Sequence, residues 1–183
     1  YEHFPDQNLV MPAALKLEKL DIKKKGQHIA YIDGAGDVVP ESLEQIGYTV
    51  TKIAPASISE NFLKNFDAVV LGIRAYNIVD ELKFKQNELF RYVEQGGTMI
   101  VQYNTNRGLV TNNLSPYDLN LSRDRVTEED AEVTFLSPDH PVLNSPNKLT
   151  GADFENWVQE RGLYFPGSWD DNFTPILSMH DVD

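Results

Sequence analysis

The chain has 183 residues, of which 41% are hydrophobic and 24% charged, and this composition is typical of one globular domain rather than a disordered chain. Its formal net charge of -12 argues against a protein that binds the phosphate backbone of nucleic acids, which needs clustered Lys and Arg. The absence of cysteine excludes disulfides, thiolate metal sites and a cysteine nucleophile, and no apolar run approaches the roughly 20 residues that cross a bilayer.

The first 26 residues differ from the rest of the chain. They contain prolines and lysines with weak hydrophobic periodicity, so we expect residues 1–26 to form an N-terminal arm or linker. Residues 27–183 are expected to form one domain. Because the first residue is Tyr1 rather than Met, we also expect the chain to be either a processed product or a piece of a longer protein.

The first structural signals lie after this arm. A short apolar, β-favouring run at 28–32 predicts a strand, and the Asp-Gly-Ala-Gly-Asp segment at 33–37 predicts a turn. Pro40 suits the first turn of a helix that ends at Gly47. The order is therefore strand, loop, helix.

This order repeats along the first half of the chain. Further strands are predicted at 48–53, 68–72 and 98–102, and the second of these is apolar throughout, as in a strand buried on both faces. Ser59 is expected to cap a short helix to residue 66, and Asp80 a longer one to residue 95. This alternation predicts an α/β fold with a mainly parallel sheet and helices on both faces, in which ligands bind outside the carboxyl ends of the strands.

The second half of the chain has a weaker pattern. A long polar stretch follows Tyr103, and strands are predicted at 132–136 and 175–179 with a short helix at 153–161. Long excursions of this kind are either binding loops or insertions.

Motifs for cofactors and metals are incomplete in this sequence. Gly34 and Gly36 follow a strand, but Val39 stands at the third glycine position of a dinucleotide-binding loop. The pairs Asp139-His140 and His180-Asp181 are better explained as turn residues than as zinc ligands. We therefore expect no cofactor and no metal.

One group of candidate ligand-binding residues lies at the predicted carboxyl edge of the sheet. Arg74 directly follows a buried strand, where it either binds an anion or is neutralised by an acid within the fold. The other candidates at this edge are Tyr76, Asn77, Asn104 and Asn106.

A second group lies in the irregular C-terminal part and combines charges with aromatic rings. Its members are Asp153, Trp157, Glu160, Arg161 and Trp169. Such a cluster stacks on and hydrogen-bonds sugars, or it pins a long loop to the body, which is the commoner reason for it.

Strands and helices alternate along the chain, the run Phe-Asp-Ala-Val-Val-Leu-Gly lies at 66–72, one helix ends at Gly96-Gly97, and the segment Ser-Pro-Asp-His-Pro-Val lies at 137–142. Together these features resemble class I glutamine amidotransferase-like domains. Residues 27–143 are most similar to their non-catalytic, trehalose-utilisation-protein-like branch. The resemblance implies a three-layer, flavodoxin-like fold. The family's nucleophilic Cys and its late His and Glu have no counterparts here, and the sheet is expected to be truncated at its C-terminal end.

A narrower resemblance concerns the segments 72–77, 103–106, 149–154 and 160–166. They are similar to the C-terminal portion of large bacterial proteins whose N-terminal part is a PIG-L deacetylase, a zinc-dependent hydrolase of N-acetylated sugars. The resemblance implies an accessory domain, with the deacetylase domain of the parent chain and a carbohydrate as partners, in the periplasm or outside the cell. The zinc motif His-Pro-Asp-Asp of that family is missing here.

Three functions stay open from the sequence. The first is a non-catalytic accessory domain that contributes carbohydrate binding or interdomain packing. The second is a hydrolase of a small carbohydrate or amide, which requires Asp153, Glu160 and His140 to converge within about 3 Å of one substrate position. The third is an interaction domain whose ligand edge is filled by another polypeptide.

Overall fold

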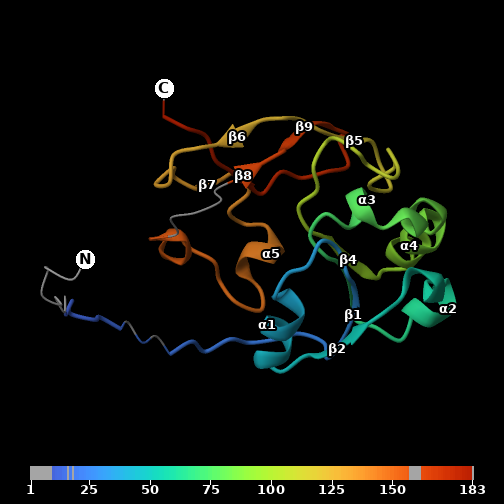
Figure 1. The fold of residues 1–183 in the computed structure, drawn as a ribbon, viewed down its shortest axis with the longest axis horizontal. Helices are drawn as coiled ribbons and strands as arrows, with labels where there is room; N and C mark the ends of the chain where they lie inside the picture. The colour runs from blue at the N-terminus through green and yellow to red at the C-terminus, as the bar shows by residue number, and fades with distance from the viewer. Residues whose placement is uncertain (1–9, 16, 18, 157–161, 183) are drawn as a thin grey trace, which may run out of the picture.

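The computed structural model describes residues 10–15, 17, 19–156 and 162–182. At its centre four parallel strands form one sheet (Figure 1): β1 (His28–Ile32), β2 (Thr49–Lys52), β3 (Ala68–Leu71) and β4 (Thr98–Val101). Their order across the sheet is β2-β1-β3-β4. The four predicted strands are confirmed to within one residue at most ends, and so is the mixed α/β fold.

Short helices connect these strands. They are α1 (Val39–Gln45), the 3-10 turn η1 (Pro55–Ser57), α2 (Glu60–Leu63), α3 (Ala75–Ile78), the 3-10 turn η2 (Asp80–Phe84) and α4 (Gln86–Glu94). The predicted cap of α2 is confirmed, because the Ser59 hydroxyl accepts a hydrogen bond from the Phe62 N–H. The prediction of Asp80 as the cap of one long helix was wrong. The fully buried Leu82 fixes a separate 3-10 turn there, and α4 begins only after Lys85.

The two central strands of the sheet, β1 and β3, are buried on both faces. Side chains at alternate positions of the central strands, such as Ile32 and Val69, pack with Leu63 of α2 and Leu89 of α4. The intervening residues, such as Tyr31 in β1, pack on the opposite face, which α1 covers. Since successive strand residues point to opposite faces, burial on both sides explains the continuous apolar runs in the sequence.

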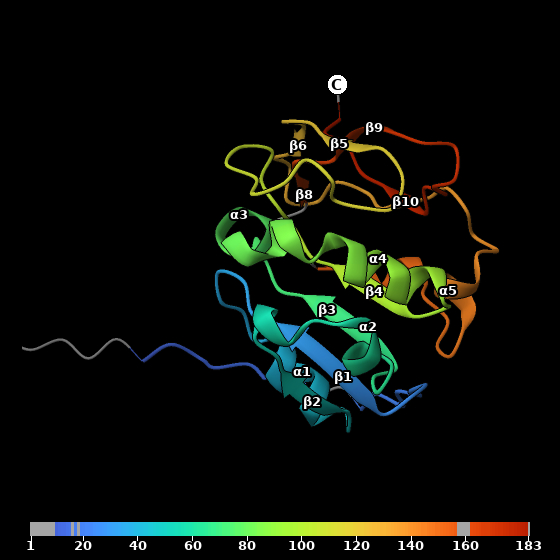
Figure 2. The same ribbon diagram turned by 90° about the vertical axis from the view of Figure 1, so that its right-hand side faces the viewer.

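The C-terminal half contains three small antiparallel pairs, β5 with β9, β6 with β8 and β7 with β10. Figure 2 shows them gathered above α3, α4 and β4. The elements are β5 (Leu119–Leu121), β6 (Arg125–Val126), β7 (Thr134–Phe135), α5 (Pro141–Asn144), the 3-10 turn η3 (Gly151–Phe154), β8 (Gly162–Leu163), β9 (Pro166–Trp169) and β10 (Leu177–Ser178). The strands predicted at 132–136 and 175–179 are confirmed as β7 and β10. Of the helix expected at 153–161, the structure shows only η3 at its start, and residues 157–161 lie outside the described part.

The N-terminal arm leaves the sheet beside β2. At its base, Asn147 binds both backbone groups of Lys23, at 2.8 and 2.7 Å, and the Asp67 carboxylate accepts the N–H groups of Gln27 and His28. The described residues 10–15, 17 and 19–22 then run away from the body (Figures 1 and 2). Within the described residues, no helix has both the length and the apolar character needed to cross a membrane.

Candidate functional site

The two loops at the carboxyl ends of β1 and β3 touch each other through their backbones. The Ala35 N–H donates a 2.7 Å hydrogen bond to the carbonyl of Ile73. A Cβ atom on Gly34 would lie only 2.0 Å from that Ile73 oxygen, so only glycine allows this approach. The crevice between β1 and β3, where ligands of such sheets usually bind, is therefore closed by the protein itself.

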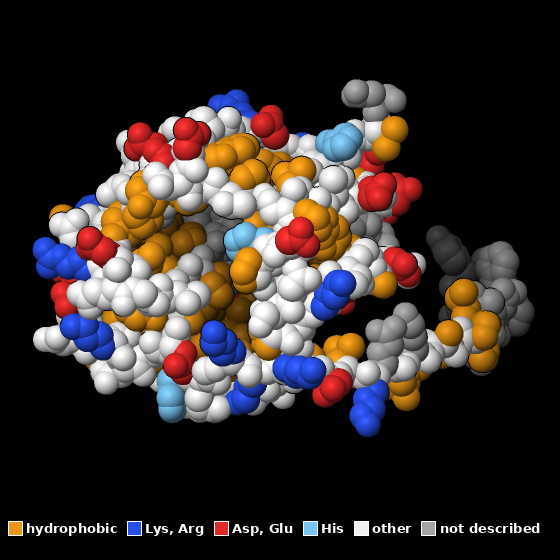
Figure 3. Space-filling view, turned by 180° about the vertical axis from the view of Figure 1, so that it is seen from behind, with side chains coloured by type: hydrophobic (Ala, Val, Ile, Leu, Met, Phe, Trp, Pro, Cys, Tyr) orange, Lys and Arg blue, Asp and Glu red, His pale blue; other side chains and the backbone are white. Residues whose placement is uncertain are grey.

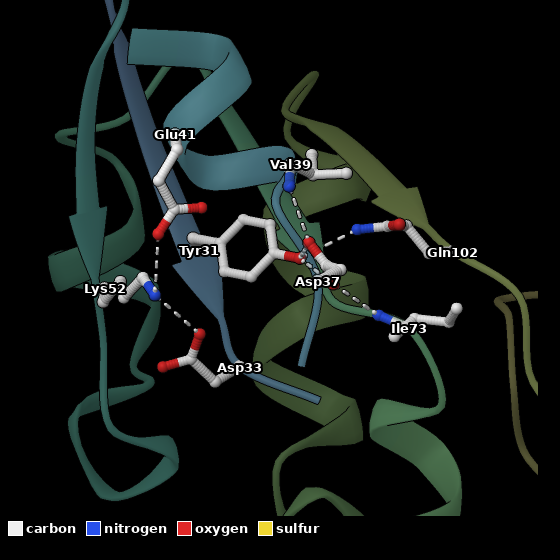
Figure 4. Close-up of polar contacts among 8 residues, drawn as sticks. All are labelled: Tyr31, Asp33, Asp37, Val39, Glu41, Lys52, Ile73 and Gln102. Atoms are coloured by element: carbon white, nitrogen blue, oxygen red, sulfur yellow. Dashed lines mark hydrogen bonds and ion pairs between the residues drawn. The ribbon is translucent and has the colours of Figure 1, made fainter. Parts of the chain in front are cut away.

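The Asp37 carboxylate fixes this closure (Figure 4). The Tyr31 hydroxyl lies 2.7 and 2.6 Å from its two oxygens, and the N–H groups of Val39 and Ile73 donate to it at 2.9 and 3.2 Å. Gln102 reaches across from the end of β4 and donates to the Tyr31 hydroxyl at 2.9 Å. One carboxylate thus joins the β1 loop, the start of α1 and the end of β3.

The charge state of this cluster follows from its contacts. Burial tends to raise the pKa of Asp37, but the hydrogen bonds from Tyr31, Val39 and Ile73 outweigh it and lower that pKa. Burial, followed by the hydrogen bond to the Asp37 carboxylate, raises the pKa of Tyr31 well above its usual value. Asp37 therefore stays ionised and Tyr31 stays protonated at neutral pH, and neither is poised as a proton donor or base.

Lys52 lies at the rim of this cluster. Its ammonium group is 3.4 Å from Asp33 and 3.8 Å from Glu41, and all three side chains are at least half exposed. Exposed ion pairs of this kind contribute little to stability, so Lys52 mainly offsets the acidic rim.

The predicted amide candidates lie together and tie two loops to each other. Asn104 accepts the Tyr76 N–H at 3.0 Å. Asn77 accepts the Thr105 N–H at 2.9 Å and donates to the carbonyls of Thr105 and Arg107, at 3.2 and 3.0 Å. These contacts hold the segment after β3 against the segment after β4, so both amides position backbone.

The remaining candidates at this edge occupy different environments. Arg74 is exposed, has a left-handed backbone with φ 57° and makes no ion pair among the described residues. Tyr76 is fully buried and donates to Gln86 at 3.2 Å, and burial raises its pKa to about 12. The buried Oδ1 of Asn106 has no hydrogen-bond partner in the described part of the chain.

A cavity of about 900 Å³ lies between the outer edge of β4 and the antiparallel pairs. Figure 3 shows a hollow lined by hydrophobic side chains on the face turned away from the viewer in Figure 1. None of the described residues that line this cavity is charged; they include Met99, Val101, Gln102, Tyr103, Asn104 and Tyr164. The rings of Tyr103 and Tyr164 lie 5.9 Å apart at its wall.

A second cavity, of about 600 Å³, adjoins the first, because Leu119, Phe165, Pro166 and Phe173 line both. Trp169 lines it and exposes 45% of its surface, although its backbone pairs with Leu119 of β5. Asp124, Thr174 and Ser178 supply the polar groups of a wall that is otherwise largely apolar. The cavity therefore presents an aromatic ring beside a few hydrogen-bonding groups.

The residues of the hydrolase hypothesis are engaged within their own turns. Asp153 accepts from the N–H and hydroxyl of Thr150, at 2.7 and 3.1 Å, as the third residue of a capping box in which Thr150 is the N-cap of η3. His140 accepts the Val142 N–H through Nδ1 at 3.3 Å at the start of α5. Glu160 lies outside the described residues, as do the candidates Trp157 and Arg161. Among the described residues no group of three His, Asp or Glu side chains is arranged to hold a metal.

The sequence pattern predicts only a turn at Asp37 and gives Tyr31 no role beyond the strand. The available signal was an aspartate just before a helix start marked by Pro40, after a strand with one tyrosine among aliphatic residues. No protein-family model, curated protein or solved structure matches the chain.

Proposed function

We propose that the chain is a catalytically silent, flavodoxin-like domain of the class I glutamine amidotransferase-like kind, which binds carbohydrate as an accessory domain of a PIG-L-type sugar deacetylase. The strand order β2-β1-β3-β4 supports the fold, because flavodoxin-like sheets have the order 2-1-3-4-5. The sequence segments that resemble the C-terminal portion of such deacetylases support the accessory role.

The chemistry of the strand-end loops favours binding over catalysis. The chain has no cysteine, and the ionised Asp37 is already satisfied by Tyr31 and two backbone N–H groups. Asn77 and Asn104 are likewise committed to backbone groups. A side chain that acts as a catalytic acid or base must instead be able to reach a proton of the substrate. Its own pKa must also lie near the working pH.

The observation that carries the carbohydrate role is the exposure of Trp169 at the wall of the 600 Å³ cavity. A tryptophan residue that remains 45% exposed presents apolar surface to water, and its indole side chain offers a flat face. Such a face stacks on a sugar ring, while Asp124, Thr174 and Ser178 are placed to exchange hydrogen bonds with hydroxyl groups. Because the chain carries a net charge of -12, we propose a neutral rather than an acidic saccharide.

Trp169→Ala is expected to weaken the binding of neutral oligosaccharides at least about tenfold, since truncation removes the stacking surface. Isothermal titration calorimetry with the wild type and the variant measures this loss. Phe84→Ala is the matched control, because Phe84 is also an exposed aromatic residue but lies in η2, away from the cavity. Equal affinity of the Trp169→Ala variant and the wild type, or equal losses in both variants, would contradict the proposal.

A further inference from the structure

The sheet ends at an apolar edge. No described strand pairs with the outer side of β4, where Ile100 is 50% and Val101 38% exposed. The Gln102 N–H donates to the Leu71 carbonyl on the β3 side, and alternate strand residues direct their backbone groups to the same side. Met99 and Val101 therefore direct N–H and C=O groups outward, beside the 900 Å³ cavity that both residues line.

This edge is a template for another strand. An edge strand with apolar side chains and outward backbone groups favours pairing with a further chain segment, and proteins usually blunt such edges with charge. β2, at the opposite edge, carries Lys52 and two exposed threonines, whereas β4 carries no charged residue. In the order 2-1-3-4-5 a fifth strand lies on the outer side of β4, the strand whose residues Met99 and Val101 line the cavity.

The N-terminal arm has the properties of the missing strand. Its described apolar residues are far more exposed than a folded chain usually tolerates: Val10 88%, Met11 73%, Leu15 82%, Leu17 85%, Leu20 69% and Ile22 47%. Leu15 and Leu17 are two positions apart, as are Leu20 and Ile22, so each pair lies on one face of an extended strand. Charged residues occupy the positions between them.

The arm and the body also have complementary charge. Residues 10–25 contain five of the 16 basic residues of the chain but only two of its 28 acidic residues. The rest of the chain is correspondingly acidic, so the arm of one molecule is attracted to the body of another.

The arm is not placed to reach β4 of its own molecule. Its base is bound by Asn147 at Lys23, and the Tyr48 hydroxyl, next to β2, donates to the Lys25 carbonyl at 3.2 Å. β2 and β4 are the two opposite edges of the sheet. From this base the arm runs away from the body, as Figure 2 shows.

We propose that residues 10–22 of one molecule add as a fifth strand to β4 of a second copy of the chain, with the apolar side chains of one face of the arm, either Leu15 and Leu17 or Leu20 and Ile22, in the cavity. Each copy offers one arm and one edge, so a reciprocal exchange closes as a two-fold dimer. Trp169 itself does not line the cavity beside β4, although Phe165 and Pro166 line both cavities.

Cysteine pairs test the proposal directly because the chain has no cysteine of its own. Variants with Leu15→Cys, Leu17→Cys or Leu20→Cys are each mixed with the Val101→Cys variant under mild oxidation. Paired strands bring opposite Cβ atoms within about 5 Å, which a disulfide can bridge, so at least one mixture should yield a mixed disulfide dimer. Val38→Cys is the control partner, since Val38 is 73% exposed but lies in the loop before α1.

Molar mass from light scattering completes the test. The wild type is expected to be a dimer. The double variant Leu15→Asp/Leu17→Asp is expected to be a monomer. Its circular dichroism spectrum should not change, because these two leucines do not pack on the body of their own molecule. Val101→Asp should act in the same way, whereas Trp169→Ala should leave the dimer intact. A monomeric wild type, disulfides formed equally well with Val38→Cys, or a dimer that survives both sets of aspartates would overturn the proposal.

Discussion

Replacement of Gly34 by alanine is expected to lower the melting temperature by roughly 10 °C. For a chain of this size this shift corresponds to a decrease of about 3 kcal/mol in the free energy of unfolding. The added Cβ would lie 2.0 Å from the carbonyl oxygen of Ile73 and 2.9 Å from the backbone of Gly72. These are backbone atoms of the segment that follows β3, so they cannot rotate away as a side chain can. Differential scanning calorimetry measures the change.

Gly151→Ala is the control for this substitution. Gly151 begins η3, no atom lies within 4 Å of the position of its added Cβ, and its φ is not positive. The melting temperature of the Gly151→Ala variant should stay within about 2 °C of that of the wild type. If the Gly34→Ala variant also melts like the wild type, the two loops do not make the contact that closes the crevice.

Asp37→Ala is expected to lower the free energy of unfolding by about 2 kcal/mol, because it leaves polar groups without a partner. The Tyr31 hydroxyl keeps only Gln102, and the N–H groups of Val39 and Ile73 lose their acceptor. Urea denaturation at neutral pH gives this difference. A decrease in the free energy of unfolding below about 0.5 kcal/mol, as expected for the substitution of an exposed residue, would contradict the role of Asp37 as the group that joins the two loops.

The Asp37→Asn substitution removes the negative charge of the side chain but keeps its size, so it tests the contribution of the charge alone. The folded-state pKa of Asp37 is lowered, so its ionised form contributes stability above the unfolded pKa of about 3.9, and this contribution is lost as the pH falls through the folded value. The difference in stability between wild type and Asp37→Asn should therefore shrink from pH 7 toward pH 3. A constant difference over this range would show that the charge of Asp37 is not coupled to folding.

The centre of the sheet could be predicted because β1 and β3 are buried on both faces. β3 is an unbroken apolar run, and Ser59 caps α2 through a purely local contact, so both leave a signal within a few residues. The start of α4 was missed, because packing of Leu82 rather than local capping determines it.

The candidate sites depend on contacts between residues far apart in the sequence. β5 and β9 pair Asn120 with Ser168, and Tyr31 meets Gln102 across three strands, which no periodicity reveals. Asn77 and Asn104 were expected at one edge, but their commitment to backbone groups follows from the exact course of two loops. The exposure of Trp169 depends on how the antiparallel pairs lie on each other.

The most direct test of the proposed function is fluorine NMR of the chain with 5-fluorotryptophan, titrated with neutral oligosaccharides. The sequence has only two tryptophans, Trp157 and Trp169, so Trp169→Phe assigns the two resonances. The Trp169 resonance is expected to shift and saturate while the saccharide in the sample stays unchanged. A Trp169 resonance that does not move, or a saccharide that is converted to products, would contradict a catalytically silent carbohydrate-binding domain.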